Sequence, residues 1–83
     1  MTTIHMDLPD EILTSLKETP EELSREIRMA AAVKLYELGK LSSGRAAQLA
    51  DVPRVSFLQS LARYGVTVVD ATEEEIADDV ASA

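Results

Sequence analysis

The sequence predicts a small, mainly α-helical protein, and three observations lead to that class. Apolar residues recur at helical spacing over most of the chain, the two candidate strands are short, and isolated glycines stand where helices would end. At 83 residues the chain is expected to form one small domain. We expect residues 1–40 to hold a strand and dimerisation helices, residues 41–65 a helix-turn-helix unit, and residues 66–83 an acidic segment that binds a partner.

The first element is expected to be a short strand ending at Pro9. Apolar and polar side chains alternate before it, which is the period-two pattern of a strand with one buried face. Proline ends the strand because it has no N–H to donate, and it suits the first turn of a short helix over residues 10–16. The strand needs a neighbour, either residues 66–69 or its own copy in a second subunit. The alternating residues are Ile4, His5, Met6, Asp7 and Leu8.

A long helix is predicted from Pro20 to about residue 38. Thr19 and Glu22 have the spacing of a capping box, and Pro20 stands at the first helical position, where its missing N–H costs nothing. Gly39 is a natural stop. Residues 29–33 are apolar all round, which favours either a core position or a dimer seam. We expect the seam, because so short a chain has little core of its own.

The segment from residue 41 to residue 63 predicts a helix-turn-helix unit. Ser42 or Ser43 can cap a short alanine-rich helix over residues 44–50, a three-residue turn follows, and a second helix runs from Pro53 or Arg54 to Arg63. The small side chains of the first helix allow a second helix to cross closely. Asp51 occupies the turn position that often carries glycine, and aspartate tolerates the left-handed conformation better than most residues.

Charge is divided unevenly along the chain. The net charge is −7, yet residues 25–63 carry seven of the eight basic residues and only three acidic ones. Residues 1–24 hold one Lys and six acids, and residues 64–83 hold six acids and no base. A basic middle between acidic ends indicates a binding function in the middle segment, although helices of an acidic protein also place bases for local reasons.

The second helix of the unit is expected to read DNA. In helix-turn-helix proteins the start of this helix enters the major groove, where Arg and Gln suit guanine and adenine edges and a small polar side chain can contact a phosphate. Alternatively, these side chains only form the solvated face of a structural helix. The residues expected to contact DNA are Arg45, Arg54, Val55, Ser56, Gln59 and Arg63.

The acidic C-terminal segment is expected to form a short strand and a helix. Thr72 and Glu75 have capping-box spacing, and acidic residues favour a helix N-terminus. An apolar edge flanked by acids could dock on a basic groove of a partner, or the segment could be a frayed terminus. Glu74 and Asp78 lie four residues apart, but a metal site is the weaker interpretation of such a charge run.

Enzymatic chemistry is not expected. The chain has no cysteine and one histidine, its three glycines are isolated, and no nucleophile stands in a recognisable arrangement. No cofactor or metal is expected. No apolar run approaches the length of a membrane span, and the N-terminus lacks the pattern of a signal peptide, so we expect a cytoplasmic protein without a membrane partner.

The sequence resembles a family of small uncharacterised prokaryotic proteins that are regarded as antitoxins. The shared pattern is Y-x-x-G-x-[LI]-S-x-G-[KR]-A-A, which begins here at Tyr36, and the opening and acidic end also match. Asp51 and Pro53 depart from the family pattern. The matching residues are Gly39, Ser42, Gly44, Ala46, Ala47 and Phe57.

The resemblance implies an antitoxin that binds its own operator DNA as a homodimer and neutralises a toxin. Such proteins are often encoded beside PIN-domain ribonuclease toxins, so the implied partner is a toxin of that type. We expect the C-terminal segment to bind it. The competing hypothesis is a dimeric protein-interaction module that does not bind DNA. The residues expected to contact the toxin are Val68, Glu75, Ile76, Asp79 and Val80.

Overall fold

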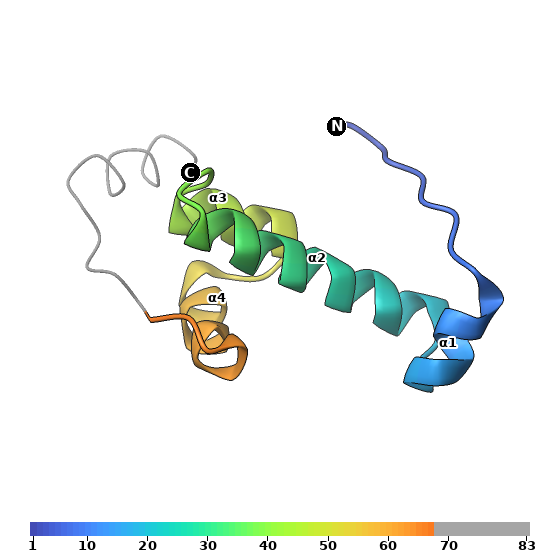
Figure 1. Cartoon of the computed structure of the whole chain (residues 1–83). Coiled ribbons are helices and arrows are strands. Elements are labelled where there is room, and N and C mark those ends of the chain that lie inside the picture. Colours follow the sequence, from blue (N-terminus) through green and yellow to red (C-terminus); the bar gives the residue numbers. More distant parts are fainter. Residues whose placement is uncertain (68–83) are drawn as a thin grey trace.

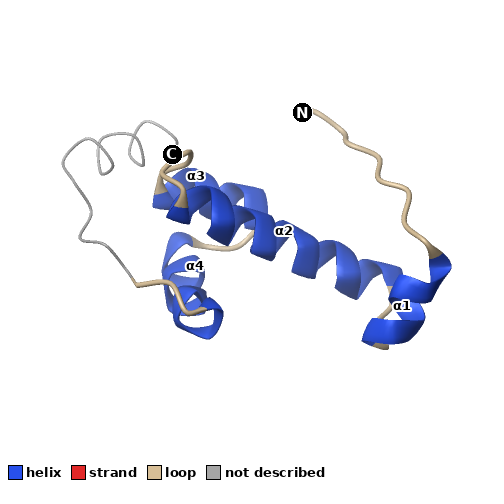
Figure 2. Ribbon diagram, viewed as in Figure 1, coloured by secondary structure: helices blue, strands red, loops and turns tan. Residues whose placement is uncertain are grey.

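The computed structural model describes residues 1–67, and these residues are helical apart from turns and an extended N-terminus (Figure 2). The prediction of a mainly α-helical protein is therefore confirmed. The helices follow one another with short connections, as Figure 1 shows. They are α1 (Asp10–Leu16), α2 (Pro20–Glu37), α3 (Ser43–Ala50), α4 (Arg54–Ser60) and the 3-10 helix η1 (Leu61–Tyr64).

The predicted N-terminal strand is not formed. Residues 1–9 precede α1 without entering a ladder. Alternating polarity specifies which face of a strand is buried, but a strand also needs a neighbour, and the described part of one chain supplies none. Val66 and Thr67, the described residues of the second strand candidate, are not in a strand either. The remainder of that strand and the predicted acidic helix lie outside the described residues.

Helix α2 begins as its sequence predicts. The Thr19 N–H donates to Glu22 Oε1 at 3.0 Å, and the Glu22 N–H donates to Thr19 Oγ1 at 3.2 Å, which completes the capping box. Both hydrogen bonds to Thr19, the backbone one first, lower the pKa of the Glu22 carboxyl below its ordinary value. Two N–H groups at the helix start, which have no carbonyl acceptor within the helix, thereby gain hydrogen-bond partners.

Helix α2 also ends where the glycine predicts. Gly39 has φ +75°, a left-handed conformation that glycine adopts without a Cβ penalty. Its N–H donates to the Tyr36 carbonyl, and the Lys40 N–H reaches back to the Leu35 carbonyl, both at 2.9 Å. This pair of bonds is the Schellman arrangement, and it turns the chain toward α3.

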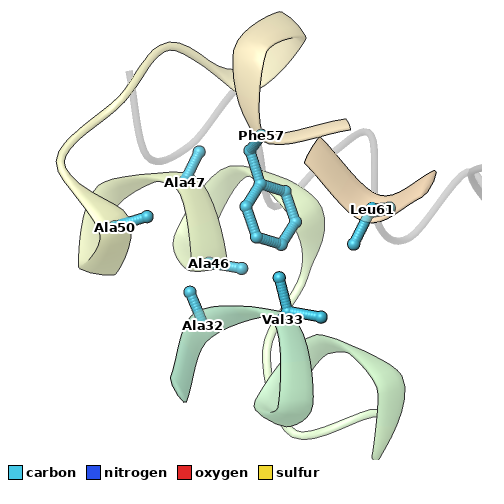
Figure 3. Close-up of a cluster of buried hydrophobic side chains, with 7 residues drawn as sticks. All are labelled: Ala32, Val33, Ala46, Ala47, Ala50, Phe57 and Leu61. Atoms are coloured by element: carbon cyan, nitrogen blue, oxygen red, sulfur yellow. The ribbon is translucent and has the colours of Figure 1, made fainter. Parts of the chain in front are cut away.

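The hydrophobic core lies where α2, α3 and α4 meet (Figure 3). The ring of Phe57 points between α3 and α2, and Leu61 lies beside it; both side chains are fully buried. Alanines on the facing sides of α2 and α3 allow these helices to approach closely. The buried members of the cluster are Ala32, Val33, Ala46, Ala47, Ala50, Phe57 and Leu61.

The position of the core differs from one expectation, and α1 lies outside it. The apolar stretch at residues 29–33 was expected at a dimer seam, but Ala32 and Val33 are buried against α3 and α4 of the same chain. Helix α1, by contrast, has no buried residue. The core therefore belongs to the C-terminal half of α2 and to the helix pair that follows it.

Candidate nucleic-acid interface

The turn between α3 and α4 has the geometry that the sequence predicts for a helix-turn-helix unit. Ser42 is the N-cap of α3, and its Oγ accepts the Arg45 N–H at 3.2 Å. Asp51 ends α3 with φ 60° and ψ 43°, so the residue in the glycine position does adopt the left-handed conformation. The Val52 N–H then donates to the Ala47 carbonyl at 3.1 Å, which fixes the turn against α3.

Helix α4 is shorter than predicted. It begins at Arg54, as one of the two expected starts, but it ends at Ser60 and tightens into η1 rather than continuing to Arg63 as α-helix. Ser60 Oγ donates to the Ser56 carbonyl at 2.9 Å, and such back-bonding serines bend helices. Gly65, with φ +69°, ends the element as expected.

Arg54 has a structural role that the sequence did not reveal. Its Nε donates to Ser43 Oγ at 2.8 Å, and Ser43 is fully buried. The hydrogen bond joins the first residue of α4 to the first residue of α3, so it sets the two helix starts beside each other. Arg54 is itself half-buried. The expected base-reading side chain therefore also positions the helix that would read the bases.

The exposed face of α4 is formed by Val55 and Gln59. Val55 is 64% exposed, and Gln59 is also exposed. They lie four residues apart and so share one face of the helix, while Phe57 on another face enters the core. Ser56 is half-buried and its carbonyl accepts from Ser60. The part of α4 that meets solvent is thus the part that was expected to enter the groove.

Two further arginines of the unit, outside α4, are exposed. Arg45 is exposed in the first turn of α3, with its Nη1 at 3.5 Å from Gln48 Oε1. Arg63 is exposed on η1, and its Nη2 donates to Ser60 Oγ at 2.9 Å. The structure therefore places one side chain that was expected to contact DNA at the start of the unit and another beyond its second helix.

Arg28 was not selected from the sequence, yet it contacts the same unit. Its Nε donates to the Leu49 carbonyl at 2.7 Å, near the C-terminal end of α3. The guanidinium satisfies a carbonyl that has no partner within the helix, and its charge lies at the negative end of the helix dipole. The only sequence signal for this contact was the concentration of bases in residues 25–63.

The residues expected to bind a toxin lie outside the described part of the chain. They are Val68, Glu75, Ile76, Asp79 and Val80. Within residues 1–67, no cluster of three or more His, Cys, Asp or Glu side chains is arranged to hold a metal ion. In the same residues no helix combines the length and apolar character of a membrane span.

Comparison with known proteins places the chain in a family. A model described as "Uncharacterised protein family (UPF0175)" matches residues 1–83. A UPF0175 protein of Aeropyrum pernix is 36% identical over 70 residues, which cover 84% of this chain and 78% of that protein. No solved structure was found to match. The resemblance seen in the sequence is thus confirmed at the level of the family: the chain belongs to the UPF0175 family.

Proposed function

We propose that this protein is an antitoxin of a toxin–antitoxin pair that binds operator DNA as a homodimer through α3 and α4. The observation that carries the proposal is the helix-turn-helix unit itself. Its second helix has an exposed face of Val55 and Gln59 opposite a buried Phe57, and Arg45 in the first turn of α3 and Arg63 on η1 are exposed as well. Helix α4 enters the major groove, and α3 crosses the backbone beside it.

Each side chain then has a distinct task. Gln59 hydrogen-bonds an adenine edge, and Val55 packs against a thymine methyl group. Arg45 and Arg63 contact phosphates, which position the protein without reading sequence. Arg54 holds α4 against α3 through Ser43, and its guanidinium is close enough to the helix start to meet the backbone or a base.

The test is a titration of a fluorescent fragment from upstream of the gene, against a scrambled fragment, at two salt concentrations. Gln59→Ala is expected to reduce the preference for the upstream fragment about ten-fold, since one bidentate base contact contributes roughly 1–3 kcal/mol. Arg45→Ala is expected to weaken binding to both fragments equally and to lower the salt slope by about 1.

Arg25→Ala is the matched control. Arg25 is exposed on α2, outside the helix-turn-helix unit, and its loss removes the same charge. It should leave both affinities close to those of the wild type. If a folded wild-type protein binds neither fragment, the DNA-binding proposal is wrong.

The second half of the proposal concerns the acidic segment at residues 66–83. It neutralises a PIN-domain ribonuclease toxin by covering the basic path along which the toxin binds RNA. The support is its six acidic residues without a base, beside the apolar Ile76 and Val80. The family resemblance supplies the type of toxin.

A protein-interaction module that does not bind DNA is the alternative. The Arg54–Ser43 hydrogen bond favours this alternative in one respect, because Arg54 has a structural role in holding α4 against α3. Salt dependence distinguishes the two functions, since binding through several phosphate contacts weakens steeply as salt rises.

A further inference from the structure

The N-terminal segment, residues 1–9, is extended and leaves its apolar side chains in solvent. It runs back from α1 and stands apart from the other helices (Figure 1). Ile4 is 83% exposed, Met6 61% and Leu8 41%. Soluble proteins rarely leave several neighbouring apolar side chains uncovered unless another surface packs on them. The segment therefore lacks a partner among the residues described in this chain.

A groove of about 780 Å³ lies between the N-terminal segment and α2. Most of its lining is apolar, although α2 contributes Ser24 and Arg28 and the segment contributes Thr2, Thr3 and His5. The apolar side chains along its walls include Ile4, Met6, Leu13, Leu23, Ile27 and Ala31. The segment and the first half of α2 thus form one continuous surface that the core of the chain does not cover.

The described residues of the other strand candidate, Val66 and Thr67, do not fill this place. The Val66 N–H donates to the Leu61 carbonyl at 3.0 Å, and Val66 packs against the core at the end of α4. DNA is a poor occupant as well, because residues 1–24 carry a net charge of −5. The same segment of a second copy offers an apolar face of the same length, and its polar side chains can pair histidine with aspartate.

We propose that the N-terminal segments of two copies pair as an antiparallel two-stranded ribbon centred on Met6, whose apolar face closes the groove along α2 of each copy. This inference deepens the dimer of the proposed function and rests on that part of it. A two-fold axis makes such an interface self-complementary. Each segment then provides the neighbouring strand that the other segment lacks.

The charges select this register. With Met6 opposite its own copy, Ile4 faces Leu8 on the apolar side, and His5 faces Asp7 on the polar side, each pair occurring twice. A shift of one residue would set apolar side chains opposite polar ones.

The other symmetric pairings place like residues together. Centring the ribbon on Asp7 brings two carboxylates face to face, and centring it on His5 pairs the two histidines. A parallel pair in register sets Asp7 opposite Asp7 and His5 opposite His5. Two carboxylates directly opposite each other destabilise a strand pair, and only the register centred on Met6 sets each Asp7 opposite a His5, so that register is favoured.

The test uses the absence of cysteine in the natural chain. Met6→Cys places two thiols directly opposite, where Cα atoms are about 4.5–5.5 Å apart and a disulfide can form. Full-length Met6→Cys is expected to cross-link as a homodimer under mild oxidation. Ile4→Cys alone is expected to cross-link at least about ten-fold more slowly, because its two copies lie about 13 Å apart.

Mixing Ile4→Cys with Leu8→Cys is the matched control, since these positions face each other in the proposed register. The mixture should form a cross-linked heterodimer as fast as Met6→Cys forms its homodimer. Circular dichroism verifies that each variant is folded, which is expected because the substituted side chains are exposed.

Charge exchange provides a second, independent test. His5→Glu sets two carboxylates opposite each other at both polar pairs and is expected to weaken dimerisation about five-fold, measured by sedimentation equilibrium. Adding Asp7→Lys to His5→Glu restores opposite charges and should recover the wild-type dissociation constant.

The outcomes separate this interface from the proposed function. A dimer in which Met6→Cys does not cross-link, or in which Ile4→Cys cross-links equally fast, overturns the ribbon but leaves the dimer in place. A wild-type protein that sediments as a monomer overturns both the ribbon and the dimer. DNA binding is decided by the upstream-fragment titration, which does not use these variants.

Discussion

At the scale of single residues, Phe57 is the side chain on which the helix-turn-helix unit depends. It is fully buried, and Tyr36 of α2 meets it edge-on, with ring centroids 5.7 Å apart and ring planes at 87°. Such a pair contributes about 0.5–1.5 kcal/mol beyond the area it buries. One aromatic ring thus joins the long helix to the helix that is proposed to read DNA.

Phe57→Ala is expected to reduce the free energy of unfolding by about 3–5 kcal/mol, because it removes a large buried side chain and leaves a cavity. A domain this small has little stability in reserve, so its cooperative thermal transition should be lost or shifted far downward in circular dichroism. Tyr64→Ala removes a ring that is 42% exposed and serves as control. Equal effects of the two substitutions would contradict this account of the core.

Ser43 and Arg54 give a second prediction at this scale. Ser43→Ala removes the acceptor of the Arg54 Nε hydrogen bond and is expected to cost about 1–3 kcal/mol of stability. DNA binding should weaken as well, because α4 loses its fixed position relative to α3, but the salt slope should stay unchanged. Chemical denaturation and the fragment titration measure the two effects. A lower salt slope would mean that the substitution at Ser43 also removes a contact with a DNA phosphate.

At the scale of elements, the start of α2 combines a stabilising and an opposing carboxyl group. The capping hydrogen bonds lower the pKa of Glu22, so its contribution to stability is present above the unfolded-state pKa and is lost as pH falls through the folded-state pKa. Glu18, just before the helix, behaves in the opposite way. A hydrogen bond with Glu26, burial, and repulsion from Glu26 and Glu22 raise the pKa of Glu18 above its ordinary value.

Glu18→Gln is therefore expected to raise the thermal midpoint near neutral pH. The folded state holds the Glu18 proton more tightly than the unfolded state does, so the wild type gains stability as pH falls through the raised pKa. The advantage of the variant should shrink in the same range. Thermal melts at several pH values measure it, with Glu11→Gln on α1 as a control of equal charge. An advantage independent of pH would contradict the assignment.

At the scale of the whole molecule, the proposal assigns DNA and toxin to separate parts. Deletion of residues 68–83 is expected to abolish inhibition of the toxin and to leave DNA binding intact. The cut preserves Val66, which packs against the core, so the helix-turn-helix unit should keep its stability. Ribonuclease inhibition and the fragment titration provide the two measurements. Loss of both activities in a folded deletion variant would argue against the division of labour.

Most of the helical framework follows from local chemistry and could be predicted from the sequence. Thr19 and Glu22 cap α2, Gly39 ends it, and Ser42 caps α3, because each of these residues satisfies backbone groups within a few positions of itself. The left-handed Asp51 was likewise foreseeable from the tolerance of aspartate for that conformation. The exposed face of α4 follows from helical periodicity alone.

Contacts between residues distant in sequence were not predictable in the same way. Arg28 at the Leu49 carbonyl and Arg54 at Ser43 depend on how two helices cross, which no local pattern encodes. The early end of α4 coincides with Ser60, whose Oγ donates back to the Ser56 carbonyl of the same helix.

The N-terminal segment shows the division between the two sources of information most clearly. Alternation of apolar and polar residues determined that residues 4–8 could form a strand with one buried face, and capping residues determined where the helices begin and end. Only the tertiary structure decided that the core forms between α2, α3 and α4 and does not cover that face. The physical reason is that backbone hydrogen bonds within helices are satisfied locally, whereas a strand is satisfied only by a neighbour that the rest of the molecule must supply.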